Sequence, residues 1–481
     1  ATLPQASSQF LCVALCQRGT GKDMSAALAS RLAELQELEN RMDQVKENYN
    51  ECLDTIWMLL ASMLVFFMHS GFSLLEAGSV RFKNAQNILA KNLIVVTVGF
   101  LCWYFMGYPI AFGAYKDPNK FAGGRNFFMD EFWNDKSKFR VWFFQGTFCA
   151  TGGTIVSGAM AERTQLKGFV TFTVLMTSFI YPFVVYWCWS GHGFMNYTND
   201  DGEAVSIVGA PFMDFAGSGI VHLVGGVGAL TGALLVGPRR GWCQDASPTE
   251  FDGHSVPFCV LGTFFLWFGW YGFNPGSTGS MHDAATAHTA GLIAVNTTIA
   301  PCFAGLMVFF LRARVIEPKR LDVGGFCNGI LAGLVAITAG CANVKPWEAA
   351  IIGLIGGVLY QCASMLLKRP RIQIDDVVDA FAVHGVNGFW ACIAVGFFGD
   401  PAEGIGGNGS LYGGNQFPTQ LFGAMLIVLW SGTLSVLIFL PLRTFGMLRL
   451  SDTFQDKGAD IMEHSPQKAY AANPAGEGEN A

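Results

Sequence analysis

The feature that most constrains this chain is a series of about eleven apolar segments, each near the twenty residues that a helix needs to cross a bilayer. They lie at about residues 55–78, 88–113, 140–160, 168–190, 212–236, 254–274, 287–311, 323–342, 347–367, 377–398 and 418–442. Only 14% of the 481 residues are charged, whereas roughly a quarter of a soluble domain is charged. Because lipid offers the backbone no hydrogen-bond partners, such segments span it as helices. The sequence therefore predicts an all-α polytopic membrane protein.

The basic residues of the connecting loops predict the orientation of these spans. Lys and Arg concentrate in every second connection, at Arg81 and Lys83, Arg163 and Lys167, Arg239 and Arg240, Arg312 to Arg320, and Lys368 to Arg371. The positive-inside rule then puts the N-terminus outside and residues 443–481 in the cytoplasm, with the basic loop 114–139 as an exception. Two sequons, at Asn196 and Asn408, fall in loops assigned to the outside and are candidate glycosylation sites.

A helix of a different kind is expected before the first span, at residues 25–50. Its apolar residues recur every seven positions, at Leu28, Leu35, Met42 and Tyr49, with Leu38 and Val45 between them. Two interpretations stay open: an oligomerising coiled coil, or an amphipathic helix lying on the protein's own surface. Cys12, Cys16 and Cys52 flank it and are candidates for disulfides in an oxidising compartment. We assign residues 1–54 to an extracellular region, 55–442 to the membrane domain and 443–481 to a tail.

Two spans carry ionisable groups, which makes them candidates for function. Asp214 and His222 are eight residues apart in a Gly-rich stretch, so on one helix they would lie about 12 Å apart along the axis. Asp379 and His384 form a similar pair in the tenth span, as expected if spans one to five and six to ten are an inverted repeat. Two imidazoles without thiolate or carboxylate partners make a poor metal site, so we expect a polar path and neither metal nor cofactor.

Several motifs occur in an order that resembles the ammonium transporter (Amt/Mep/Rh) family, most closely its plant-type eukaryotic Amt branch. The motifs are Gly71-Phe72-Ser73-Leu74-Leu75-Glu76-Ala77-Gly78-Ser79-Val80-Arg81, Gln145-Gly146-Thr147-Phe148, Gly158-Ala159-Met160-Ala161-Glu162-Arg163, the Asp214 stretch, Trp270-Tyr271-Gly272-Phe273-Asn274-Pro275-Gly276-Ser277, and the His384 segment. The resemblance implies a homotrimer in the plasma membrane, with one pore through each subunit.

The resemblance also implies roles for individual residues. Phe148, Trp189 and Ser277 match an outer vestibule that recruits the ammonium cation, with Asp214 below it, and Trp187 is a neighbouring candidate. Phe148 and Phe273 match a stacked constriction, and His222 and His384 match a pair of histidines that line the pore. Ammonium would be deprotonated, and ammonia would cross an apolar pore that excludes potassium. Whether the proton travels along stays open; methylammonium would serve as an analogue.

Other classes of function fit the sequence less well than transport. The main alternative is an ammonium receptor that signals through its tail, and an Rh-like gas channel is a third reading. An enzyme is disfavoured because the chain shows no nucleophile–base pair or phosphate loop, and nucleic acid is disfavoured because no basic block accompanies the net charge of −6.

The tail carries one departure from the family pattern. Residues 449–464 resemble the family's cytoplasmic gating segment, but Met462 stands where plant members carry a phosphorylatable Thr. Phosphorylation at Ser465, Ser451 or Thr453, or no such control, stays open.

Overall fold

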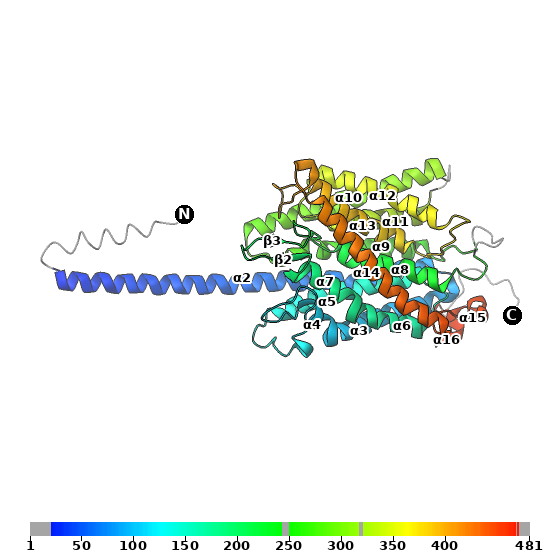
Figure 1. Ribbon diagram of the computed structural model, residues 1–481, viewed down its shortest axis with the longest axis horizontal. Coiled ribbons are helices and arrows are strands. Elements are labelled where there is room, and N and C mark those ends of the chain that lie inside the picture. The colour runs from blue at the N-terminus through cyan, green and yellow to red at the C-terminus, as the bar shows by residue number, and fades with distance from the viewer. Residues whose placement is uncertain (1–20, 243–249, 317–320, 468, 471–481) are drawn as a thin grey trace. The chain divides into compact units, whose positions relative to one another are not determined.

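A computed structural model describes residues 21–242, 250–316, 321–467 and 469–470 of the chain, which are mainly helical (Figure 1). Among these residues, nine helical stretches are long and apolar enough to cross a membrane: Ser25–Ser79, Phe82–Phe112, Leu166–Trp189, Ser218–Val236, Val256–Thr278, Ala284–Ile316, Pro346–Leu367, Phe381–Phe398 and Phe417–Thr444. The two remaining expected spans fall on helices α5 (Lys138–Ala159) and α11 (Val323–Thr338). The predicted all-α polytopic fold is confirmed.

The other helices are α2 (Gly21–Ser79), α3 (Ala85–Cys102), α4 (Tyr108–Phe112), α6 (Leu166–Leu175), α7 (Tyr181–Trp189), α8 (Val224–Val236), α9 (Val256–Phe273), α10 (Ala284–Leu311), α12 (Pro346–Leu367), α13 (Asn387–Phe398), α14 (Phe417–Thr444), α15 (Asp452–Lys457) and α16 (Ala459–Glu463). A small antiparallel sheet, with strand order β1 (His192–Gly193), β2 (Asn196–Thr198) and β3 (Ala204–Val205), occupies the loop after α7.

Helix α2 covers two stretches that the sequence predicted as separate helices, at 25–50 and 55–78. It is continuous over 59 residues, because no glycine or proline lies between residues 22 and 70 to interrupt it. The chain divides between Ile56 and Trp57 into two compact units. In the first unit the repeating apolar residues are exposed, for example Leu35 at 57% and Met42 at 63%.

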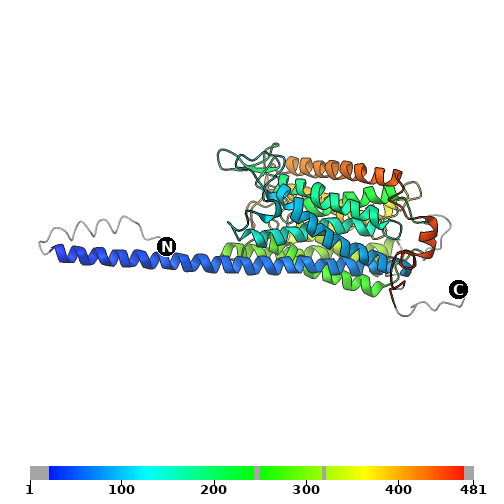
Figure 2. The same ribbon diagram turned by 90° about the horizontal axis from the view of Figure 1, so that it is seen from below.

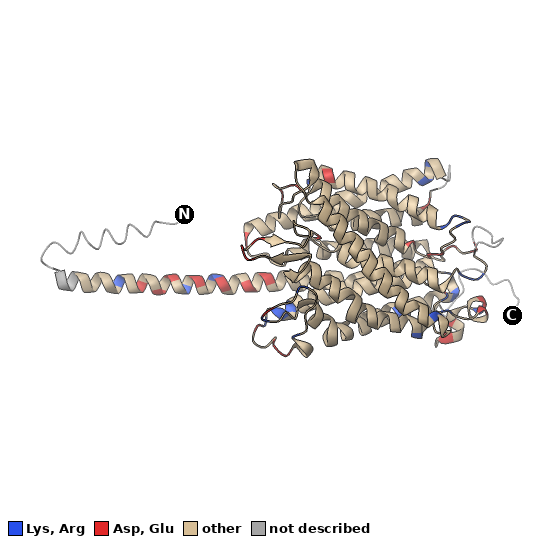
Figure 3. Cartoon of the chain, viewed as in Figure 1, with Lys and Arg blue, Asp and Glu red and all other residues tan. Residues whose placement is uncertain are grey.

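The second unit is a bundle formed by the helices from α3 to α14 (Figures 1 and 2). Charged residues gather at the two ends of this bundle and leave a broad uncharged band between them (Figure 3). Large apolar side chains also face outward, including Leu93, which is 69% exposed, and Leu429, which is 66% exposed. A bundle that is apolar both inside and on its outer face is suited to lipid as its solvent.

Two of the expected spans begin with an irregular segment instead of a helix. The segment at 212–236 becomes helical only at the π-helical turn η5 (Ser218–Leu223), and the segment at 377–398 only at η8 (Phe381–Val386). Asp214 and Asp379 therefore precede their helices, and the expectation that Asp214 and His222 share one helix is wrong. The physical reason is that Asp214 is used to cap the helix that carries His222.

Close contact between glycines holds these two helices together. A Cβ atom on Gly226 of α8 would lie 2.2 Å from the backbone nitrogen of Gly385 in η8. A Cβ atom on Gly388 would lie 2.7 Å from the carbonyl oxygen of Ser218. Since no side chain fits at either position without a shift of the backbone, the glycines set the separation of the helices that carry His222 and His384.

The basic loops meet at one end of the bundle in a network of buried ion pairs. Glu162 accepts hydrogen bonds from Arg81 at 2.6 Å and from Arg239 at 3.1 Å, and Arg239 also pairs with Asp375 at 2.9 Å. Burial alone would raise the pKa of Glu162, but the guanidinium groups of Arg239 and Arg81 outweigh it and hold that pKa below its ordinary value. The loops that the sequence assigned to one side of the membrane thus lie together.

The tail docks at this same end. The carboxylate of Asp460 in α16 accepts the backbone N–H groups of Gln86 and Asn87, each at 2.9 Å, and so caps the first turn of α3. Burial raises the pKa of Asp460, while these two N–H groups act in the opposite direction. Met462 is half-buried and Ser465 is exposed.

The contact at Gly226 leads to a test of the fold. We expect Gly226→Ala to lower the thermal unfolding temperature of the detergent-solubilised protein, because the added methyl group would force the two helices apart at a cost of about 1–3 kcal/mol. Gly291→Ala in α10 is the matched control, since a Cβ atom there would meet no atom within 4 Å. Equal unfolding temperatures for the two variants would contradict this account.

Candidate functional site

A row of neighbouring aromatic rings, which we call the ring file, runs through the interior of the bundle. Phe148 of α5 and Phe273 of α9 are fully buried and stack with their ring centroids 4.0 Å apart and their planes at 19°. Trp189 lies 6.0 Å from Phe148 on one side of the pair, and His222 lies 5.4 Å from Phe273 on the other. The half-buried Ser277 donates its hydroxyl to the carbonyl oxygen of Phe273 at 2.8 Å. The stacked pair therefore separates Trp189 from the buried His222.

The two neighbouring tryptophans of α7 have different surroundings. Trp187 is 1% exposed, and its ring packs edge-on against Trp430 at 4.9 Å. Trp189 is half-buried, and its Nε1 donates to the backbone oxygen of Asp214 at 2.8 Å. Trp189, and not Trp187, thus lies beside Phe148 and is fixed to the segment that leads to His222.

The carboxylate of Asp214 is fully engaged with the backbone. Its two oxygens accept four N–H groups at 2.8–3.1 Å, from Gly217, Ser218, Gly219 and Ile220. Gly217 has a φ of 101°, a conformation that favours glycine and brings these N–H groups to one point. Asp214 therefore orders the start of η5.

The two imidazoles meet at the centre of the bundle. Nδ1 of His222 and Nδ1 of His384 are 3.2 Å apart, and the rings are nearly parallel at 15°. Because one of these nitrogens must donate and the other accept, the pair holds one proton between them. His222 also stacks on Trp270 at 5.0 Å, and His384 lies 6.1 Å from Phe72. Both rings lie in motifs quoted from the sequence, but neither of them was predicted to lie beside the histidines.

The second half of the chain repeats the arrangement at Asp214, but with a different aspartate from the one expected. Asp376 accepts the N–H groups of Ala380 at 2.9 Å and Phe381 at 2.7 Å, and so caps η8. It precedes His384 by eight residues, the spacing of Asp214 and His222. The expected pairing of Asp379 with His384 is therefore wrong. A search for an aspartate eight residues before His384, the same spacing as between Asp214 and His222, would have identified Asp376.

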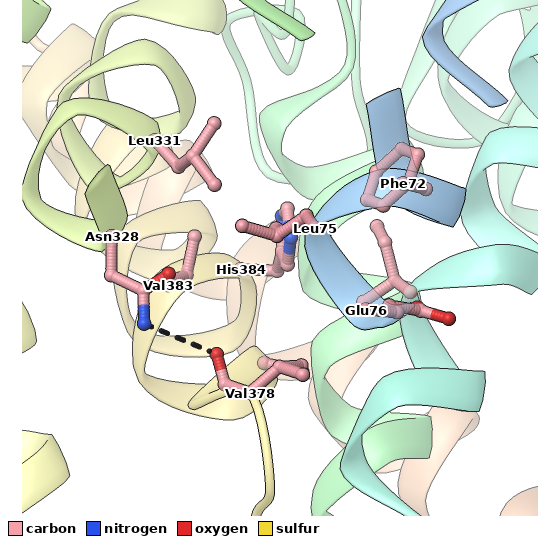
Figure 4. A pocket seen from close by; sticks show the side chains of 10 residues that line it. Phe72, Leu75, Glu76, Asn328, Leu331, Val378, Val383 and His384 are labelled. Atoms are coloured by element: carbon pink, nitrogen blue, oxygen red, sulfur yellow. Dashed lines mark hydrogen bonds between the residues drawn. The ribbon is translucent and has the colours of Figure 1, made fainter. Parts of the chain in front are cut away.

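A small pocket borders His384 (Figure 4); we call it the pocket below His384, because Asn328 and Val378 in its lining also line a cavity at the end where the basic loops meet. The pocket's volume of about 10 Å³ is roughly the space that one water molecule requires. Besides His384, its lining is mainly apolar and includes Phe72 and Leu75. Glu76 also borders it, but Figure 4 shows the end of this side chain turned away from His384. The carboxylate of Glu76 accepts instead from Ser157 at 2.8 Å.

The candidate modification sites differ in their surroundings. Asn408 is exposed, whereas Asn196 is half-buried in β2 and donates to the carbonyl oxygen of Cys188 at 3.3 Å. Cys52 is an exposed free thiol, and Cys12 and Cys16 lie outside the described residues. Within the described part of the chain, no group of three or more His, Cys, Asp or Glu side chains is arranged to hold a metal ion.

These features define a class of protein. The bundle is solvated by lipid on its outer face, and a file of rings with two paired imidazoles lies in its buried interior. Such a path suits a small molecule that can be neutral, because a bare ion would lose its hydration without compensation. The molecule is therefore an integral membrane protein with the interior of a transporter or channel.

The comparisons with known proteins identify the family. Residues 56–470 match the model of the Ammonium Transporter Family. The chain is 38% identical over 436 residues to ammonium transporter Amt2 of Archaeoglobus fulgidus, covering 89% of this chain and 90% of that one. It is 34% identical over 452 residues to ammonium transporter 1 member 3 of Solanum lycopersicum, covering 90% and 95% respectively. The chain belongs to the ammonium transporter family.

Solved structures agree with this assignment. One, described as a sensor Amt protein, superposes with a TM-score of 0.76 at 32% identity and covers 87% of this chain and 100% of that one. Another, Mep2 of Candida albicans, gives a TM-score of 0.74 at 28% identity and covers 87% and 92% respectively. The resemblance stated from the motifs is confirmed at the level of the family.

The contacts of Asp214 lead to a second test. Asp214→Asn keeps the shape of the side chain but replaces one carboxylate oxygen with an NH₂ group. This NH₂ group would face two backbone N–H groups that then have no acceptor, and each unpaired buried N–H group costs about 1–3 kcal/mol of stability. We expect a lower unfolding temperature and slower uptake of labelled methylammonium by cells that express the variant.

The control for this test is Asp283→Asn. Asp283 is an exposed residue that caps α10 by accepting the N–H of Thr286, and Asn caps a helix about as well as Asp. If Asp214→Asn behaved like this control in both assays, the capping carboxylate would not hold the site together.

Proposed function

We propose that the protein takes up ammonium across the plasma membrane. The observation that carries this proposal is the ring file, in which a stacked Phe148–Phe273 pair separates a half-buried tryptophan from two imidazoles whose Nδ1 atoms are 3.2 Å apart. Ammonium binds at the outer end, loses its proton, and passes as ammonia to the pocket below His384.

The recruitment step uses the residues at the outer end of the file. The faces of Trp189 and Phe148 attract a partly desolvated cation by about 2 kcal/mol at best. The hydroxyl of Ser277 replaces one lost water molecule. Asp214 favours a cation electrostatically, but its two oxygens already accept four N–H groups and so do not bind the cation directly.

Selectivity follows from deprotonation and not from size. Potassium and ammonium are similar in size, but only ammonium can shed a proton and cross an apolar path as a neutral molecule. Entry of a bare ion into this buried path costs several kcal/mol. His222 and His384 can accept the proton and hand it on, because neutral imidazole accepts at one nitrogen and donates at the other.

We further propose how the chain is assembled and oriented. The exposed seam of α2, which includes Leu35, Met42 and Tyr49, pairs with the same seam of neighbouring subunits outside the cell, in a homotrimer. The tail and the basic loops face the cytoplasm, as the charge distribution favours. Asn408 is the better glycosylation candidate because it is exposed, whereas Asn196 is half-buried.

The main alternative is an ammonium receptor. One similar structure is described as a sensor Amt protein, and α15 and α16 of the tail contact the bundle through Asp460 and its neighbours. A receptor of this kind would bind ammonium and change the contacts of its tail while conducting little.

Transport is tested by voltage clamp of cells that express the chain, with ammonium added at constant potassium. We expect a saturable inward current that potassium alone does not evoke. Faster uptake of labelled methylammonium without any current would mean neutral passage of ammonia. If neither signal appeared in protein shown to be at the cell surface, the transport proposal would fail and the receptor alternative would be favoured.

The assembly of α2 is tested by oxidative cross-linking in a Cys12→Ser/Cys16→Ser background. The seven-residue repeat places Cys52 on the seam with Leu38 and Val45, so we expect oxidation to link two full-length chains through Cys52. The control moves the thiol off the seam with Cys52→Ser/Glu47→Cys. Equal cross-linking of both variants, or of neither, would contradict the pairing of the helices.

A further inference from the structure

A second polar site lies near the pocket below His384, and an ammonium group of the chain itself is bound there. Lys368, at the end of α12, directs its Nζ to Oδ1 of Asp379 at 2.8 Å and to Oγ of Ser364 at 3.1 Å. Ser364 in turn donates to the other carboxylate oxygen of Asp379 at 2.8 Å, and Tyr360 donates to that oxygen at 3.1 Å. The two hydroxyls therefore orient the carboxylate towards the Lys368 amine.

The position of this site connects it to the ring file. Asn328 and Val378 border the pocket below His384, and they also border a cavity of about 640 Å³ that is lined by Lys368 and Asp379. Nδ2 of Asn328 donates to the carbonyl oxygen of Val378 at 3.3 Å (Figure 4), so these two residues form part of the wall that the pocket and the cavity share. The cavity lies at the end of the bundle where the basic loops and the tail meet.

The two partners differ in their freedom to move. The side chain of Asp379 is 8% exposed, and its backbone is held at a φ of 58°, which is uncommon for a residue other than glycine. The side chain of Lys368 is 46% exposed and has a flexible stem. The carboxylate is thus a fixed part of the site, while the lysine amine can leave it.

The chemistry of the bound group suggests what else fits. The head of a lysine is an ammonium ion in which one N–H is replaced by a carbon, so a site that binds the Lys368 amine also offers ammonium a carboxylate and a hydroxyl oxygen. We propose that Asp379 and Ser364 form a release site for ammonium and small alkylammonium cations at the inner mouth, and that Lys368 competes for it. This inference rests on the proposed function, because the cation that it concerns re-forms below His384 when ammonia takes up a proton, relayed by the two imidazoles or donated by water.

The competition has a physical consequence for transport. A free buried carboxylate at the exit would hold the departing cation, whereas a carboxylate that Lys368 neutralises again after each release would not. Lys368 therefore keeps the affinity of the site for ammonium low enough for the cation to leave. Conduction through an ion pathway requires binding that is weak enough for release.

The test measures cation binding by thermal unfolding of the full-length, detergent-solubilised protein, titrated with methylammonium chloride against choline chloride. Removing the competitor with Lys368→Met should lower the half-saturating methylammonium concentration at least about threefold, as expected for loss of a half-exposed ion pair. The matched control is Arg369→Met, which removes the same charge from the exposed neighbouring residue.

Two further variants assign the gain in binding to this site. Adding Ser364→Ala to Lys368→Met should reverse the gain, and adding Asp379→Asn should abolish it; the serine variant keeps the test valid if the aspartate variant does not fold. The inference is overturned if Lys368→Met binds methylammonium like Arg369→Met, or if the gain survives Ser364→Ala. This experiment measures binding and not transport. If the wild-type protein transported no ammonium, the proposed function would be refuted, but the change in methylammonium binding could still be observed.

Discussion

The close approach of two helices through glycine is the constraint on which the rest of the structure depends. His222 and His384 come from segments 162 residues apart in the sequence, and they meet because Gly226 and Gly385 leave no side chain between their helices. Each helix begins only where an aspartate gathers its first N–H groups, so the position of each imidazole is set by a cap eight residues earlier. Capping, glycine contact and histidine pairing are therefore parts of one arrangement.

The same arrangement explains how carboxylates can lie near an apolar path without trapping a cation. Asp214 uses both of its oxygens to hold backbone N–H groups, so neither oxygen is left without a partner. Asp376 is used in the same way at the start of η8. Asp379 differs, because its partners are side chains and one of them is a lysine that can move. On the proposed function, a cation binds directly at the mouths of the path, and the described interior between them is lined mainly by apolar side chains, aromatic rings and two imidazoles.

Much of this could be predicted from the sequence, because membrane spans are local signals and the motifs are specific. Each of the eleven expected spans falls on a helix of the described chain, and the Phe148–Phe273 pair expected from the resemblance is stacked. What could not be predicted depends on non-local geometry or on the competition between capping and helix extension. Hydropathy does not separate a capping aspartate from a helical one, so the span at 212–236 was expected to be helical throughout. Trp270 and Phe72 stand in the quoted motifs, but their packing against the imidazoles was not predicted because such contacts leave no mark in the sequence.

The central claim is that paired imidazoles in an otherwise apolar path carry ammonium by separating its proton from ammonia. The most direct measurement compares ammonium-evoked and potassium-evoked currents in the wild type and in His222→Leu/His384→Leu, with the amount of protein at the surface matched. Our account predicts that the ammonium current falls at least about tenfold, a loss of about 1.4 kcal/mol or more in the free energy of activation, while potassium stays excluded. An ammonium current and a potassium exclusion that both matched the wild type in the double variant would contradict it.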